Sequence, residues 1–139
     1  MIIKCSDYLS NDAVKIRTEV FVTEQGFKVE FDEIDKKAKH IVMYDGETPV
    51  AVCRFYGINE SGLYSVGRIA VTKQYRGRGL GAEILESAEN EIKKLGGTAV
   101  ELSAQVQAEK FYTKQGYTPI GDTYLDEYCP HIKMSKQLK

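Results

Sequence analysis

The stretch Arg76-Gly77-Arg78-Gly79-Leu80-Gly81 lies between a strand predicted to end at Val71 and a helix predicted over residues 82–95. Its three alternating glycines let the backbone turn sharply and approach a ligand closely. The free N–H groups at the start of the helix point into the same space, where the helix dipole also favours an anion. Arg76 and Arg78 supply positive charge. The stretch therefore predicts a binding site for a phosphate or a pyrophosphate group.

Two other phosphate-binding loops do not fit this spacing. A nucleotide P-loop requires Gly-x-x-x-x-Gly-Lys-Ser/Thr, and the sequence contains no such run. The dinucleotide fingerprint requires Gly-x-Gly-x-x-Gly, whereas the glycines here are Gly77, Gly79 and Gly81. A turn that only links strand to helix is the structural alternative. Two arginines beside three glycines favour the anion site over that alternative.

The chain before this stretch contains one predicted helix and several predicted strands. Ser10-Asn11-Asp12 supplies capping residues for a helix that runs to about Gln25, and Gly26 acts as its stop. Asp45-Gly46 and residues 59–62 are turn signals between strands. We expect a loop or irregular helix over residues 28–38, and strands that form an antiparallel meander at residues 2–3, 41–44, 50–56 and 63–71.

The chain after the glycine stretch begins with a helix whose apolar side chains share one face, and Gly96-Gly97 ends that helix. A short helix that stops at Gly116 follows later. The strands expected here lie at residues 99–102, 118–124 and 131–136. This mixed order predicts an α+β fold, an α/β sandwich in which helices cover both faces of a mixed, mainly antiparallel central sheet.

Length and composition suit a single soluble globular domain over residues 1–139. Hydrophobic residues make up 42% of the chain and charged residues 28%, and the formal net charge is −1. Lysine and arginine are spread along the chain, which argues against a nucleic-acid partner. No apolar run approaches membrane-spanning length, and the N-terminus lacks the apolar core of a signal peptide.

The cysteines predict neither disulfides nor a metal site. Cys5, Cys53 and Cys129 are odd in number and widely spaced, which gives no disulfide framework and no zinc pattern. Reduced thiols are typical of the cytoplasm. We therefore expect a cytoplasmic protein that binds no metal, no nucleic acid and no membrane, and we leave open whether it forms a homodimer.

The glycine stretch also carries a family resemblance. Arg76-x-x-Gly79-x-Gly81 looks like the Arg/Gln-x-x-Gly-x-Gly/Ala signature of the GNAT superfamily of N-acetyltransferases. Arg68-Ile69-Ala70-Val71 is similar to the family strand before this loop. Residues 108–117 resemble the family segment Ala-x-x-Phe-Tyr-x-x-x-Gly-Phe. A narrower resemblance to the ElaA-like branch rests on Arg17, residues 20–25, Asp32, Asp35, His40, Ala104-Gln105 and residues 131–134, so that the matches together cover nearly the whole chain.

The resemblance implies that the loop cradles the pyrophosphate of acetyl-CoA while the backbone of the preceding strand pairs with the pantetheine arm. It also implies that Tyr112 is the general acid that protonates the leaving thiolate. The residues expected to bind the coenzyme are Ile69, Ala70, Val71, Arg76, Gly77, Arg78, Gly79, Leu80, Gly81, Ala82 and Gln105.

Two positions depart from the family pattern. Gln105 stands where many members place an asparagine, three residues before the alanine. Many members also carry a glutamate as general base on the strand before the loop, but residues 63–71 contain no carboxylate. The resemblance therefore leaves the base unassigned.

The function that follows is acetyl-CoA-dependent N-acetyltransfer, in which the acetyl group moves directly to a primary amine of a small, cationic acceptor. Two alternatives stay open at this point. One is a non-catalytic acyl-CoA-binding module on the same fold, and the other is an acetyltransferase for protein amino groups.

An acidic cluster follows the first predicted helix and consists of Glu24, Glu30, Asp32, Glu33 and Asp35. A charge cluster is usually a solvated surface. In the GNAT fold, however, the segment after the first helix commonly lines the acceptor site, where an acidic wall suits a cationic amine. Both interpretations stay open, and the second predicts that Glu24 and Asp32 contact the acceptor.

The sequence contains two histidines, His40 and His131, and both lie beside predicted strands. A lone histidine is more often structural than catalytic. Either one is nevertheless a candidate contact to the acceptor and a candidate proton acceptor near neutral pH.

Overall fold

The computed structural model describes residues 1–28 and 30–138. The strands are β1 (Ile2–Ser6), β2 (Lys39–Asp45), β3 (Thr48–Gly57), β4 (Leu63–Val71), β5 (Ala99–Gln105), β6 (Thr118–Asp126) and β7 (Cys129–Gln137). The α-helices are α1 (Asn11–Arg17), α2 (Ile34–Lys37), α3 (Leu80–Lys94) and α4 (Glu109–Lys114), and shorter or wider helical turns are η1 (Thr18–Glu24), η2 (Lys73–Tyr75) and η3 (Val106–Ala108). Within the described ranges, no helix combines the length and the apolar character needed to cross a bilayer.

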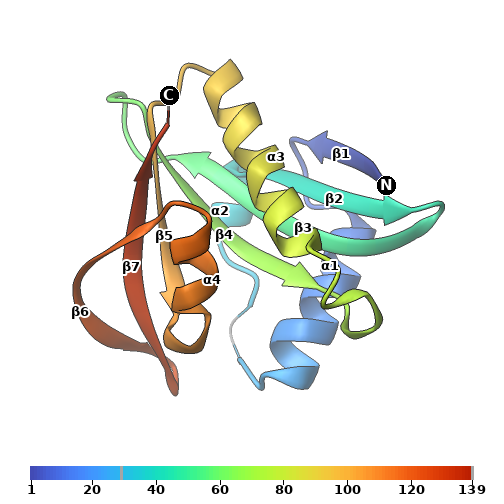
Figure 1. Cartoon of the computed structure of the whole chain (residues 1–139). Coiled ribbons are helices and arrows are strands. Elements are labelled where there is room, and N and C mark those ends of the chain that lie inside the picture. The colour runs from blue at the N-terminus through green and yellow to red at the C-terminus, as the bar shows by residue number, and fades with distance from the viewer. Residues whose placement is uncertain (29, 139) are drawn as a thin grey trace.

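The strands form one mixed sheet in the order β1-β2-β3-β4-β5-β7-β6, which confirms the expected α+β fold (Figure 1). β4 and β5 are parallel, and the other neighbouring pairs described are antiparallel. The segment expected to be irregular over residues 28–38 contains α2, and its residue 29 lies outside the described part of the chain.

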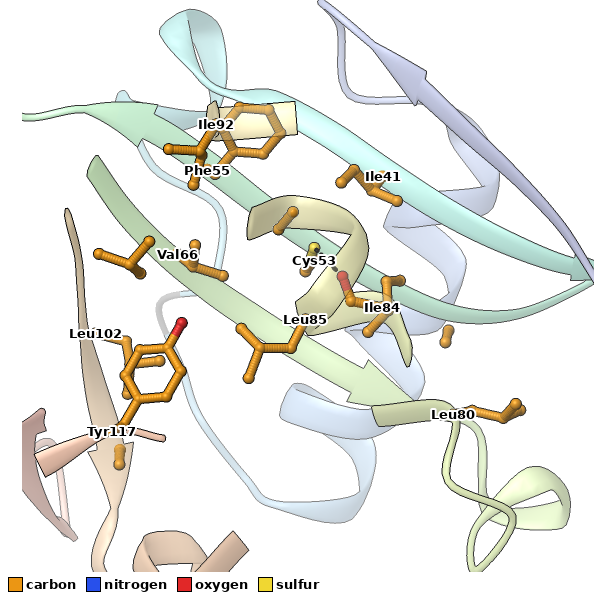
Figure 2. Packing of buried hydrophobic residues seen from close by; sticks show 14 of the residues in the cluster. Ile41, Cys53, Phe55, Val66, Leu80, Ile84, Leu85, Ile92, Leu102 and Tyr117 are labelled. Carbon is orange, nitrogen blue, oxygen red and sulfur yellow. Dashed lines mark hydrogen bonds between the residues drawn. The ribbon is translucent and has the colours of Figure 1, made fainter. Parts of the chain in front are cut away.

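Helices cover both faces of the sheet. Side chains along a strand alternate between its two faces, and both faces carry apolar side chains that the helices bury. In β3, Cys53 and Phe55 belong to the apolar cluster beneath α3, whereas Val52 belongs to the cluster beneath α1. Figure 2 shows the first cluster, in which side chains of α3 meet those of β3 and β4. Its labelled members include Cys53, Phe55, Val66, Ile84, Leu85 and Ile92.

The first helix is less regular than its sequence predicts. Ser10 caps α1 as expected, since its hydroxyl accepts a hydrogen bond from the Ala13 N–H at 3.2 Å. From Thr18 onward, however, the helix is of the wide π type, and the Gln25 N–H bonds to the Val20 carbonyl five residues back. Such π turns are rare and occur frequently at functional sites.

A β-bulge bends β4 in the middle of the sheet. The β3–β4 register places two residues of β4, Arg68 and Ile69, opposite the one residue Cys53. Arg68 has a φ of 53°, in the left-handed region that side chains other than glycine rarely adopt. β4 pairs with β5 through Leu63 to Ser65 only, so the two strands separate beyond that point, as Figure 1 shows. A bulge increases local bend and twist, which accounts for the separation.

A closed ring of ion pairs, which we call the charge ring, holds the bulge. Three arginines and three carboxylates alternate, with N–O distances from 2.7 to 3.4 Å, and the ring runs Arg17–Glu30–Arg68–Asp32–Arg54–Asp35 and back to Arg17. Its members come from α1, the segment around α2, β3 and β4. The charge ring therefore ties the first helix and the following segment to the bulged strand.

Burial opposes ionisation inside the charge ring, but the arginines counteract it. Burial works against the charged form of Asp35, yet hydrogen bonds from Arg17 and Arg54 outweigh this and hold the pKa of its carboxyl well below the usual range. Burial raises the pKa of Glu30 against the pull of Arg17 and Arg68. A buried ion pair that loses one partner leaves an uncompensated charge, which is more costly than replacing the whole pair.

We predict that Asp35→Asn lowers the free energy of unfolding by about 3–5 kcal/mol, because Arg17 and Arg54 then share an uncompensated buried charge. Urea denaturation measures this change. The matched control is Asp7→Asn, which removes one partner of the exposed ion pair with Lys39 and should change stability little. Equal small effects in the two variants would contradict a structural role for the charge ring.

Candidate active site

A cavity of about 220 Å³ lies where β4 and β5 separate. Its walls come from four parts of the chain: η1 with the segment after it, the middle of β4, the end of β5 with α4, and the β6–β7 hairpin. Beyond Ser65 the edge of β4 that faces β5 has no ladder partner among the described strands. Backbone groups along that edge are therefore available to hydrogen-bond an extended ligand.

The coenzyme residues expected on β4 lie on both sides of the strand. Ile69 lines the cavity. Ala70 is buried in the cluster beneath α1, so its side chain packs on the opposite face. The Val71 carbonyl accepts a hydrogen bond from Arg76 Nε at 2.9 Å, which anchors the glycine loop to the end of the strand.

The glycine loop has the open backbone that an anion site requires. Gly77 and Gly79 have φ values of 79° and 78°, and a Cβ added at either position meets nothing within 4 Å. Gly79 is the N-cap of α3, which starts two residues earlier than its sequence predicts. Because glycine has no side chain to cap the first N–H groups of a helix, those groups are left for a ligand. This arrangement fits a pyrophosphate.

The other loop residues pack the loop against the fold. A Cβ added at Gly81 would lie 3.4 Å from the Phe111 ring, so the small residue lets α3 approach α4 closely. Leu80 is buried in the core, and Ala82 is half-buried in the first turn of α3. Gly81 therefore serves packing, whereas Gly77 and Gly79 serve the open backbone.

Both arginines of the loop have protein partners. The two Nη atoms of Arg76 each donate to one carboxylate oxygen of Glu24 at 2.9 Å. Arg78 donates to the Gln74 carbonyl at 3.2 Å and lies over the Tyr75 ring at 4.7 Å. An incoming pyrophosphate must therefore compete with Glu24 for Arg76.

Tyr112 of α4 lines the cavity. Its half-buried ring meets the rings of Phe111 and Tyr117 edge-on, with centroids 5.0 and 6.1 Å away. Removal from water raises the pKa of Tyr112 to about 12, so the hydroxyl keeps its proton throughout the neutral range. A proton donor is therefore present in the cavity.

Gln105 ends β5 and connects the cavity to η1. Its amide donates to Gln25 Oε1 at 2.8 Å, and its own oxygen accepts from Gln107 at 2.6 Å. Gln25 also lines the cavity, and its carbonyl accepts a hydrogen bond from the Tyr128 hydroxyl of the β6–β7 hairpin.

Of the four residues expected to contact the acceptor, His131 lines this cavity and the other three lie elsewhere. Glu24 is bonded to Arg76 of the glycine loop, and Asp32 is bonded to Arg54 and Arg68 in the charge ring. His40 is buried in β2, where Nε2 lies 3.0 Å from the Asp35 carbonyl. The acidic cluster is therefore neither a solvated face throughout nor a free wall, because arginines take up most of its charge.

Three further charged residues line the cavity: Glu30, which belongs to the acidic cluster, Arg68 and Asp126. A sequence signal for the first two was present. Arg17, Arg54 and Arg68 each interrupt an apolar stretch, and such a residue is buried only when it is paired. The three arginines are opposite in charge to the acidic cluster, and they pair with three of its five members, Glu30, Asp32 and Asp35. Asp126 lies in the exposed β6–β7 hairpin.

Comparison with known proteins places this geometry in a family. The family model described as Acetyltransferase (GNAT) domain matches residues 5–138. YjcF of Bacillus subtilis, described as an uncharacterized N-acetyltransferase, is 38% identical over 128 residues that cover 90% of each chain. An acyl-CoA N-acyltransferase from Pseudomonas aeruginosa is 28% identical and superposes with a TM-score of 0.86, over 97% of this chain and 98% of that one.

ElaA of Escherichia coli is also similar. It is 25% identical over 130 residues, which cover 90% of this chain and 85% of that protein. Its crystal structure has a TM-score of 0.81 and covers 97% of this chain and 99% of that one. The resemblance seen in the sequence is therefore confirmed. The chain belongs to the GNAT acetyltransferase family, and it is an acetyltransferase that uses an acyl-CoA.

Proposed function

We propose that the protein transfers the acetyl group of acetyl-CoA directly to a primary amine of a small, cationic acceptor. The observation that carries this proposal is the cavity between the separated strands, which is lined by the middle of β4, the strand that leads to the glycine loop, and has a protonated tyrosine in its wall. The pyrophosphate is bound by the loop and by the N-terminus of α3. The pantetheine arm lies along the free edge of β4 and presents the thioester to the cavity.

The proposed chemistry divides between the walls of the cavity. A backbone N–H on the bulged part of β4, near Ile69, stabilises the oxyanion that forms on the thioester carbonyl. Tyr112 gives its proton to the departing sulfur. Gln105 fixes the end of β5 through its bond to Gln25 and so sets the position of the wall opposite β4.

The acidic cluster no longer supports a cationic acceptor, since arginines neutralise Glu24 and Asp32. Asp126 supports it instead. This residue lines the cavity, and no described residue forms an ion pair with it. A carboxylate at the cavity wall attracts a protonated amine and raises its local concentration.

The test of the proposed function is release of free coenzyme A from acetyl-CoA in the presence of an amine. Spermidine, glucosamine, kanamycin and a lysine peptide cover the acceptor classes in question. Turnover with one of the small cations supports the proposal. Turnover with the lysine peptide alone would shift the assignment to protein amino groups, and acetyl-CoA binding without turnover of any amine would contradict the proposed transfer.

We predict that Gly79→Val abolishes measurable acetyl-CoA binding, because a side chain at the positive φ of the N-cap strains the loop and blocks the pyrophosphate. Calorimetry measures the affinity. Gly96→Val is the matched control, since Gly96 also has a positive φ and open space but lies at the other end of α3. The Gly96→Val variant should lose about as much stability as the Gly79→Val variant and bind acetyl-CoA with normal affinity. Equal affinity in the two variants would contradict the assignment of the loop.

We predict that Tyr112→Phe lowers kcat on the order of 10²-fold, because it keeps the ring and removes the proton donor. Release of free coenzyme A gives kcat, and acetyl-CoA affinity is measured on the same samples. The affinity should not change. Tyr44→Phe is the control, since the Tyr44 hydroxyl bonds to Asp12 away from the cavity. Unchanged turnover in Tyr112→Phe would leave this hydroxyl without a part in catalysis.

We predict that Glu24→Gln tightens acetyl-CoA binding by about 2- to 5-fold, because it removes the carboxylate that competes with the pyrophosphate for Arg76. The gain should shrink in high salt, since both partners are partly exposed. Calorimetry at two ionic strengths measures it. Weaker binding in this variant would mean that Glu24 holds Arg76 in place for the ligand.

A further inference from the structure

His131 is held in one orientation at the wall of the cavity. Its Nδ1 lies 2.9 Å from the Cys129 carbonyl oxygen, and its ring stacks on Tyr124 at 6.1 Å and meets the Phe27 ring edge-on at 6.4 Å. A carbonyl oxygen only accepts hydrogen bonds, so Nδ1 must carry a hydrogen. In the neutral ring the lone pair is therefore on Nε2.

The Nε2 atom is the open end of this ring. His131 is 6% exposed and lines the cavity, and Nε2 has no hydrogen-bond partner among the described residues. The described residues also contain no buried side-chain nitrogen or oxygen that lacks a partner, which means that Nε2 is accessible. The backbone thus leaves a lone pair exposed to whatever occupies the cavity.

His40 does not share these properties. Its Nε2 lies 3.0 Å from the Asp35 carbonyl, so in His40 the atom that carries the hydrogen is Nε2. Burial lowers the pKa of His40, and the residue does not line the cavity. The two histidines therefore have opposite tautomers and different surroundings.

We propose that His131 is the general base of the reaction and that its Nε2 removes the proton from the acceptor ammonium. This proposal deepens the proposed acetyl transfer and rests on it. An amine must lose its proton before it can attack, and residues 63–71 offer no carboxylate for that task. The charged and titratable groups around the cavity are Glu30, Arg68, Tyr112, Tyr124 and Asp126. Of these, Glu30 already accepts hydrogen bonds from the charge ring.

The proton balance closes with two side chains. Nε2 takes one proton from the ammonium and passes it to solvent. The neutral nitrogen then bonds to the thioester carbonyl carbon, the C–S bond breaks, and the sulfur takes a proton from Tyr112. The nitrogen sheds its second proton, which restores the Tyr112 hydroxyl through water. One proton is released for each acetyl group transferred.

The first test needs no acceptor. Long-range ¹H–¹⁵N spectra of the protein with and without acetyl-CoA report which nitrogen of each neutral imidazole is protonated. The chain contains two histidines, and contacts to the Tyr124 ring identify His131 without any variant. We expect hydrogen on Nδ1 and a lone pair on Nε2 for His131, and the reverse for His40. Hydrogen on Nε2 of His131 would overturn the proposal.

The second test compares two amines of nearly equal size. Ethylamine is protonated at pH 7, whereas 2,2,2-trifluoroethylamine is largely neutral. The variant is His131→Asn, whose amide can still donate to the Cys129 carbonyl but cannot accept a proton. We expect kcat/KM for ethylamine to fall on the order of 10²-fold. We expect a much smaller loss for trifluoroethylamine, and the ascending limb of the ethylamine pH profile to move to higher pH.

Acetyl-CoA affinity measured on the same samples shows whether the variant is folded and binds the coenzyme. Equal losses for the two amines at normal affinity would overturn the proposal, because the step assigned to His131, removal of the ammonium proton, is needed only for the protonated amine. If the wild-type protein acetylates neither amine, the proposed transfer to small amines fails, and the imidazole spectra still decide the state of His131.

Discussion

The charge ring is the interaction on which the cavity depends. Its arginines and carboxylates alternate, so each charge has two neighbours of opposite sign. Burying charges is costly, and ion pairs in apolar surroundings often contribute little net stability compared with apolar side chains. The closed ring instead holds its six side chains, and the segments that carry them, in one defined arrangement. It fixes Arg68 at a backbone conformation that a free strand would avoid.

The consequences of that conformation extend across the sheet. The extra residue at Arg68-Ile69 bends β4, the bend ends its pairing with β5, and the separated edge leaves both a cavity and unpaired backbone groups. The same strand leads into the glycine loop, where the Val71 carbonyl anchors Arg76. Strain at one residue, maintained by ion pairs from three other elements, thus produces the site that the loop serves.

The sequence predicted the elements of this fold well because their signals are local. Alternating apolar residues, capping residues and glycine turns identified the strands and helices to within a few residues, and the glycine loop predicted an anion site whose open backbone the structure has. The π-type turns of η1 were not predictable, because they depend on how Val20 and Phe21 pack on the sheet. The ion pairs of the acidic cluster could not be predicted from the sequence either. The partners of Asp32 and Asp35 lie on α1, β3 and β4, far away in the chain.

Gln105 shows how the two chemical walls of the cavity are related. It is paired in register with His131 across β5 and β7, and the chain continues from it through η3 into α4, which carries Tyr112. Its side chain bonds to Gln25, the residue next to Glu24, which in turn bonds to Arg76 of the glycine loop. Gln105, at the end of β5, is thus connected both to Tyr112 and to His131. Because a β-ladder fixes relative positions more tightly than a loop does, the register of β5 with β7 sets the position of Gln105 relative to His131.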